Sequence, residues 1–155
     1  MLGYWNNAIE TNKSIKEGWL HTGDIGHFDN GFLKITDRKK DIIITPGGDN
    51  ISPVKIENDL IKIEFLEQAL VYGDNKPFLV ALLVLNNNEK NIEKENIYNE
   101  IEKINKNLTK IEKIKKFFIV KEQFSIENGF MTPTLKLKRY KIIQKYKVEL
   151  EKLYQ

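Results

Sequence analysis

The sequence has no cysteine and only two histidines, His21 and His27, among its 155 residues. Without cysteine, the chain cannot form a disulfide framework, a thiolate nucleophile or a cysteine-based zinc site. The two histidines are therefore the only candidates for an imidazole base or ligand. We predict no metal site built by this chain alone.

Long apolar runs and a large charge imbalance are also absent. No apolar stretch approaches the roughly 20 residues needed to span a bilayer, and the N-terminus lacks a signal-peptide pattern. We therefore expect a soluble, cytoplasmic protein. The 25 basic and 22 acidic residues give a net charge of +3, and the basic residues are dispersed without a stacking platform, so no nucleic-acid partner is expected.

What is present is enough for one packed domain, or one domain with a fragment of another. Hydrophobic residues make up 41% of the chain, with 8 Phe, 6 Tyr and 2 Trp for a core. Residues 18–53 hold most of the glycines and read as short strands joined by tight turns. Asp-Asn-Gly at residues 29–31 is a strong hairpin signal, and residues 32–36 and 42–45 are rich in β-forming side chains.

The rest of the chain alternates helical and strand-like segments. Ser52 and Pro53 read as the N-cap and first residue of a helix, whereas residues 1–17 read as a loop or a loose amphipathic segment. Residues 69–73, 78–85 and 117–120 are strand candidates. Apolar residues at helical spacing predict one helix for about four turns and a second that ends the chain; these are Ile97, Ile101, Ile104, Leu108, Ile111, and then Ile142, Ile143, Tyr146, Leu150, Leu153. The order predicts an α+β fold, a small domain with a short antiparallel or mixed β-sheet flanked by helices.

The charged cluster at residues 37–41 reads from the residues alone as a solvated connection between strands. Three other features have both a structural and a functional interpretation. Asp24 can cap a turn or hold ribose hydroxyls. Gly47 and Gly48 can form a plain strand-to-helix loop or a close approach to a ligand. The basic cluster at residues 136–139 can be a solvated face or an anion site.

Four sequence motifs carry a resemblance to a known family. They are Gly-Trp-Leu-His-Thr-Gly-Asp-Ile-Gly at residues 18–26, Thr-Asp-Arg-Lys-Lys-Asp at 36–41, Gly-Gly-Asp-Asn-Ile-Ser-Pro at 47–53, and Thr-Pro-Thr-Leu-Lys-Leu-Lys-Arg at 132–139. In this order and spacing they resemble the adenylate-forming superfamily, which includes acyl-CoA synthetases, peptide-synthetase adenylation domains and luciferases. The last motif resembles that of long-chain acyl-CoA synthetases.

The resemblance implies a domain organisation. Residues 1–36 would be the tail end of the large N-terminal, adenylate-binding domain, and their strands would precede the small domain. Residues 37–41 would be the hinge, and residues 42–155 the C-terminal lid domain. On this basis the chain covers about the C-terminal quarter of a full enzyme, without its phosphate-binding loop.

The resemblance also implies roles for individual residues. Asp24 and Arg38 would bind the nucleotide, and Asp37 would be the hinge residue. Gly47 and Gly48 would line the CoA channel, although relatives usually carry Lys or Glu at the next position, where this chain has Asp49. Lys136 would be the catalytic lysine of adenylation, with Lys138 as its rival.

The implied activity is that of a ligase in fatty-acid metabolism. ATP with Mg²⁺ would activate a fatty acid to an acyl-adenylate, and CoA, the co-substrate, would accept the acyl group. The chain would need the missing N-terminal domain as a partner, would be inactive alone, and could reach a membrane peripherally through that missing part. The alternatives are a stand-alone complementing or binding module, a remnant without catalysis, and an adenylation domain that uses another acceptor.

Overall fold

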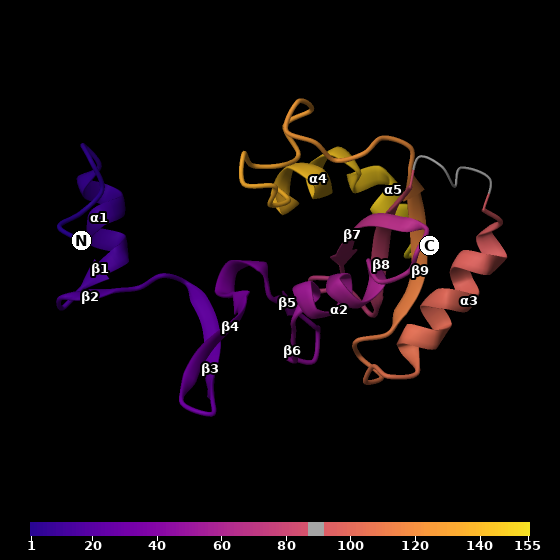
Figure 1. Ribbon diagram of the computed structural model, residues 1–155, viewed down its shortest axis with the longest axis horizontal. Helices are drawn as coiled ribbons and strands as arrows, with labels where there is room; N and C mark the ends of the chain where they lie inside the picture. The colour runs from indigo at the N-terminus through magenta and orange to yellow at the C-terminus, as the bar shows by residue number, and fades with distance from the viewer. Residues whose placement is uncertain (87–91) are drawn as a thin grey trace. The chain divides into compact units, whose positions relative to one another are not determined.

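The computed structural model describes residues 1–86 and 92–155, which form two compact units, residues 1–40 and residues 41–155 (Figure 1).

The first unit contains one short helix and two antiparallel strand pairs. Helix α1 (Ala8–Ser14) begins after Asn7, whose side chain accepts a hydrogen bond from the Glu10 backbone N–H. The sequence predicted a loop or loose segment here, and this was wrong because a local cap starts the helix. Strand β1 (Ile15–Lys16) pairs with β2 (Trp19–Leu20).

The second pair is the hairpin of β3 (Asp24–Asp29) and β4 (Phe32–Arg38). Asn30 and Gly31 connect the strands with φ of 49° and 86°, as the hairpin signal predicted, because an Asn-Gly pair accepts positive φ at low cost. Strand β4 extends two residues beyond the predicted segment. Asp37 and Arg38 therefore belong to a strand rather than to a solvated connection, and a 3₁₀ turn η1 (Lys39–Asp41) follows them.

The second unit is built around a mixed three-stranded sheet in the order β7-β8-β9. Strand β7 (Leu66–Tyr72) is antiparallel to β8 (Leu79–Leu85), and β9 (Ile114–Val120) is parallel to β8. Before the sheet come the short pair β5 (Ile43–Ile44) and β6 (Asn50–Ile51), and then helix α2 (Pro53–Leu60) with Ser52 as its N-cap. The predicted α+β fold with a mixed sheet and flanking helices is confirmed.

Helices cover both faces of this sheet, and the central strand β8 has its residues Leu79 to Val84 fully buried. Ala81 and Leu83 face a cluster that includes α2 and α3 (Lys94–Asn105), while Leu82 and Val84 face α4 (Arg139–Lys145) and α5 (Lys147–Lys152). A strand buried on both faces reads as a continuous apolar run rather than an alternation.

Two helix predictions were partly wrong, one in where the helix ends and one in its continuity. Helix α3 stops at Asn105, so Leu108 and Ile111 lie beyond it. The buried Asn105 side chain accepts a hydrogen bond from Ile114 N and donates one to Ile114 O, each 2.9 Å long. The predicted terminal helix is divided at Tyr146 into α4 and α5.

Candidate functional site

Asp24 and Arg38 face each other across the hairpin of the first unit. They are register partners at the open end of β3 and β4, and Arg38 Nε lies 2.9 Å from Asp24 Oδ1. Asp24 is the first residue of a strand, and its backbone N–H donates to Thr22 Oγ1. The two predicted nucleotide ligands are thus brought together, with one carboxylate oxygen facing the guanidinium.

Asp37, the predicted hinge residue, is the only buried residue of the first unit, with 7% of its surface exposed. It pairs in register with Ile25, beside the irregularity between Ile25 and Gly26. Its Oδ1 has no hydrogen-bond partner among the described residues. Burying a carboxylate oxygen without a hydrogen-bond donor costs free energy, so the position of the Asp37 side chain destabilises this arrangement.

The loop that carries Gly47 and Gly48 connects β5 to β6 and is closed by Thr45 and Asp49. Thr45 N donates to Asp49 O at 3.0 Å and Asp49 N donates to Thr45 Oγ1 at 3.1 Å, while Thr45 Oγ1 donates to Asp49 Oδ2. Gly48 has φ of 87°, in the left-handed region that favours glycine. The Asp49 side chain, which departs from the superfamily pattern, thus has a contact within the loop.

The base of this loop is fixed by the turn that follows β7. Ile44 N donates to Asp74 Oδ1 at 3.1 Å, and Asn75 N donates to Ile44 O at 2.9 Å. After the loop, β6 leads directly to Ser52, whose Oγ accepts a hydrogen bond from Lys55 N. The glycine loop is therefore connected to α2 through β6 and Ser52 alone.

The predicted catalytic residue, Lys136, lies on a tight loop before α4. Thr132 holds its backbone on both sides: Thr132 N donates to Lys136 O at 2.8 Å, and Lys136 N donates to Thr132 Oγ1 at 3.0 Å. Leu135 has φ of 59°, which places the chain reversal immediately before Lys136. The Lys136 side chain is exposed, and no ion pair to it is formed within the described residues.

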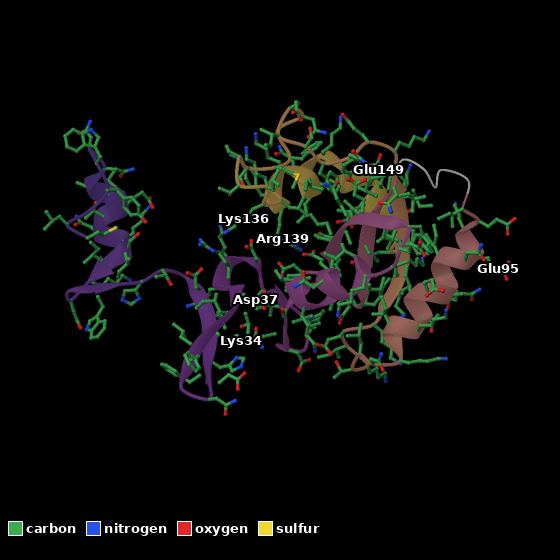
Figure 2. All side chains as sticks on the ribbon, in the orientation of Figure 1. Lys34, Asp37, Glu95, Lys136, Arg139 and Glu149 are labelled. Carbon is green, nitrogen blue, oxygen red and sulfur yellow. The ribbon has the colours of Figure 1, made fainter. Side chains whose placement is uncertain are left out.

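Arg139, three residues after Lys136, anchors the start of α4 to the body of the unit (Figure 2). Its guanidinium donates to Glu57 Oε1 of α2 and to Val71 O of β7, each at 2.6 Å. Glu57 Oε1 also accepts from Val71 N at 2.6 Å. Burial raises the pKa of Glu57, and the Arg139 guanidinium opposes this shift.

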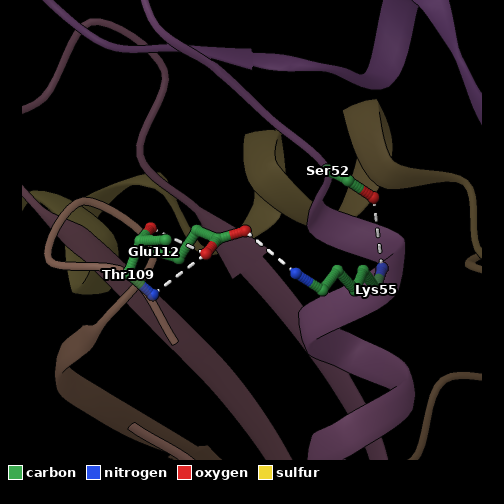
Figure 3. A network of polar contacts seen from close by, with 4 residues as sticks. All are labelled: Ser52, Lys55, Thr109 and Glu112. Atoms are coloured by element: carbon green, nitrogen blue, oxygen red, sulfur yellow. Dashed lines mark hydrogen bonds and ion pairs between the residues drawn. The ribbon is translucent and has the colours of Figure 1, made fainter. Parts of the chain in front are cut away.

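A second polar network holds the first turn of α2 (Figure 3). Lys55 Nζ lies 3.3 Å from Glu112 Oε1, and the other Glu112 oxygen accepts from the backbone and hydroxyl of Thr109. The hydrogen bond from the Thr109 side chain lowers the pKa of Glu112. Helix α2 is thus held from two sides, near its start and in its middle.

Sequence reasoning missed two contributors to this site. Thr132 lies inside the quoted motif, and Thr side chains often hydrogen-bond nearby backbone in turns, so a local signal existed. Glu57 gave no local signal, because its partner Arg139 lies 82 residues away in the sequence.

Other kinds of site are not found in the described part of the chain. There, no group of three or more His, Asp or Glu residues could hold a metal ion. None of the described helices has the length and apolarity to cross a membrane. Two open surface depressions beside α3 are lined by residues that include Phe65, Glu100 and Lys103, and neither contains a predicted site residue.

Comparison with known proteins finds the family that the sequence motifs resemble. The family model for the AMP-binding enzyme C-terminal domain matches residues 40–155. The long-chain-fatty-acid–CoA ligase FadD15 of Mycobacterium tuberculosis is 34% identical over 98% of this chain, and the long-chain-fatty-acid–CoA ligase ACSBG2 of Xenopus laevis is 35% identical over 99% of it.

Solved structures show the same relationship. The adenylation domain of a carboxylate reductase from Mycobacterium chelonae superposes with a TM-score of 0.88 at 25% identity, covering 98% of this chain and 26% of that one. The O-succinylbenzoate coenzyme A synthetase of Bacillus subtilis, in complex with AMP, gives 0.69 at 31% identity, covering 90% of this chain and 27% of that one.

The chain spans only part of the length of these relatives. The chain spans 29% of FadD15 and 26% of ACSBG2. The match to the family model begins at the end of the first unit and runs to the last residue of the chain. The chain therefore belongs to the adenylate-forming, AMP-binding enzymes, and residues 40–155 are their C-terminal domain.

Proposed function

We propose that this chain supplies the C-terminal part of a long-chain fatty-acid–CoA ligase. The observation that carries the proposal is the 34–35% identity to long-chain-fatty-acid–CoA ligases over 98–99% of the chain. The loop from Thr132 to Arg139 supports it, because it presents an exposed lysine on a fixed backbone. The substrates would be a fatty acid, ATP as its Mg²⁺ complex, and CoA.

In the first half-reaction the fatty-acid carboxylate attacks the α-phosphate of ATP, giving acyl-adenylate and pyrophosphate. Negative charge gathers between the attacking oxygen and the phosphate oxygens. The Lys136 ammonium would stabilise this charge electrostatically, without acting as a base. Its exposed position leaves it able to enter a site formed elsewhere in the enzyme.

Asp24 and Arg38 would bind the nucleotide. The ion pair between Arg38 Nε and Asp24 Oδ1 orients both side chains. A carboxylate has several acceptor positions, so Asp24 can still accept hydrogen bonds from ribose hydroxyls, and a guanidinium has further donors for ribose or phosphate oxygens.

In the second half-reaction the CoA thiol attacks the acyl-adenylate and releases AMP. A rotation at Asp37 would withdraw Lys136 and bring in the loop with Gly47 and Gly48 to line the CoA channel. The unpartnered Oδ1 of Asp37 supports a role in this movement, because a buried oxygen without a donor destabilises the present arrangement and so favours a change at this residue.

The complete activity would require the partner domain. The chain carries no phosphate-binding loop rich in Gly, Ser and Thr, and we propose that alone it does not catalyse the reaction. The N-terminal adenylate-binding domain would supply ATP phosphate contacts and the acyl site, in the cytoplasm, and any peripheral membrane contact would come from that domain.

The test is a fusion in which this chain replaces its matching segment in FadD15. We expect ATP–pyrophosphate exchange that depends on a long-chain fatty acid, and no exchange by the 155-residue chain alone. In the fusion, Lys136→Ala should lower exchange by about 100-fold or more, while thioester formation from supplied acyl-adenylate persists. Equal loss of both half-reactions would contradict the role of Lys136, and an inactive wild-type fusion would favour a binding module or remnant.

The second candidate is adenylation followed by transfer to a carrier-bound thiol. It is favoured by the TM-score of 0.87 to the adenylation–carrier didomain of a carboxylic acid reductase from Segniliparus rugosus, at 26% identity. Offering the same fusion CoA or a pantetheinylated carrier protein separates the two candidates by which thiol becomes acylated.

A further inference from the structure

We propose that the buried ion pair between Glu57 and Arg139 is a positioning device for Lys136, which holds the lysine loop at a fixed place on α2 and β7. The proposal rests on the function proposed above for Lys136. It assigns a role in adenylation to two residues that do not touch the substrate.

The pair is built as a closed three-point contact. Arg139 donates through one terminal nitrogen to Glu57 and through the other to Val71 O, and Glu57 accepts from Val71 N. All three distances are 2.6 Å, and only 14% of the Arg139 side chain and 12% of that of Glu57 are exposed. A planar guanidinium bound at two points cannot rotate without breaking one contact.

The pair occupies an edge of the sheet. Strand β7 has β8 on one side only, and Val71 lies within it. The backbone N–H and C=O of Val71 that face away from β8 bind Glu57 and Arg139 in place of another strand. The two side chains therefore fix α2, β7 and the start of α4 to one another at one point.

The connection from this point to Lys136 is short and stiff. Arg139 is the first residue of α4, and Lys138 N donates to Phe130 O at 2.7 Å. Thr132 then binds both backbone groups of Lys136. A displacement of Arg139 would consequently be transmitted to Lys136 rather than absorbed by a flexible loop.

The glycine loop is held differently. Asp74, Asn75 and the β5–β6 pair fix it, and none of these contacts involves Arg139. Helix α2, which follows the glycine loop and carries Glu57, keeps its contact from Lys55 to Glu112 and its buried Ile56 and Leu60 when the ion pair is lost. Loss of the ion pair should therefore disturb the Lys136 loop, which serves the first half-reaction, more than the glycine loop, which serves the second. A general loss of stability would affect both.

The experiment compares three variants of the fusion with FadD15. Arg139→Lys keeps a charge beside Glu57 but cannot bind two acceptors in a fork. Glu57→Met combined with Arg139→Met removes both charges together, so neither charge is left buried without its partner, although Val71 N–H and C=O lose their side-chain contacts. Lys145→Gln removes an exposed charge from the same helix and is the matched control.

We expect the double variant to lower the rate constant of adenylation by about 10- to 100-fold, since small misplacements have effects of this size. The KM for ATP and the rate of thioester formation from supplied acyl-adenylate should change less than about threefold. Arg139→Lys should lie between wild type and the double variant, and Lys145→Gln should match wild type. Equal losses in both half-reactions, or no loss in the double variant, would overturn the proposal.

A second measurement does not depend on catalysis. In the 155-residue chain, amide hydrogen exchange of Lys136 and Lys138 should increase more in the double variant than exchange in β8, which reports global unfolding. If the wild-type fusion is inactive but this change is seen, the positioning is supported and the assigned reaction fails. Unchanged exchange at Lys136 would overturn the positioning itself.

Discussion

The carboxylate of Asp49 closes the loop that holds Gly47 and Gly48 through its contact with Thr45. Within this closed loop the two glycines are not equivalent. Gly48 has φ of 87°, and only Gly48 of the pair lies in the left-handed region. A side chain at Gly47 would come within 3.3 Å of Asp49 Oδ2, a contact that a small movement of the carboxylate relieves.

Gly48→Ala should therefore destabilise the chain more than Gly47→Ala. We expect a loss of about 1 kcal/mol in the free energy of unfolding for Gly48→Ala, from the cost of left-handed backbone with a Cβ, and about half of that or less for Gly47→Ala. Urea unfolding of the two variants measures the difference. Equal losses of stability would contradict the explanation that Gly48 is needed for its positive φ.

Thr109 and Glu112 give a prediction of pH dependence. The Thr109 hydroxyl lowers the pKa of Glu112 from its ordinary value of 4.5. A carboxyl group with a lowered pKa in the folded state contributes stability above its ordinary pKa, and this contribution is lost as the pH falls through the lowered value.

Thr109→Val should consequently be less stable than wild type at pH 7, and the difference should shrink as the pH falls below 4.5. Unfolding free energies from urea titrations across this range provide the measurement. The same substitution in a Glu112→Gln background is the control, because the side chain at position 112 then cannot titrate. A difference that persists there with the same pH dependence would assign the effect to another group.

At the scale of elements, local patterns predicted the parts that local chemistry determines. The Asn30–Gly31 hairpin and the start of α2 at Pro53 were predicted from turn and cap residues that act on their own neighbours. The end of α3 was not, because Asn105 binds the backbone of Ile114, which belongs to another element. The pair of Glu57 and Arg139 was missed for the same reason.

Asn105 joins the end of α3 to the start of β9, and it is only 2% exposed. Asn105→Leu would leave the N–H and C=O of Ile114 buried without their partner. We expect a loss of about 2–3 kcal/mol in the free energy of unfolding, measured by urea unfolding. Asn107→Leu, at an exposed position two residues later, is the control and should cost less than about 0.5 kcal/mol. Similar losses for the two would contradict this role of Asn105.

At the scale of the whole molecule, the two units differ in how they bury apolar surface. Residues 41–155 contain both hydrophobic clusters, with β8 between them. In residues 1–40, Asp37 is the only buried residue, and Phe28 and Phe32 of the hairpin are 77% and 79% exposed. A unit without buried apolar residues has little to offset the conformational entropy lost on folding.

Residues 41–155 should therefore fold alone, and deletion of residues 1–40 should change their free energy of unfolding by less than about 1 kcal/mol. The deletion should also lower the binding of a hydrophobic dye such as ANS, because the exposed aromatic side chains of the hairpin are removed. Phe28→Ser with Phe32→Ser in the 155-residue chain is the matched variant and should lower dye binding without altering the unfolding of the larger unit. If the deletion instead abolished cooperative unfolding, the core of residues 41–155 would depend on the first unit.

In a complete ligase the same hairpin should become protected from hydrogen exchange, since the N-terminal domain proposed as its partner would cover these aromatic residues.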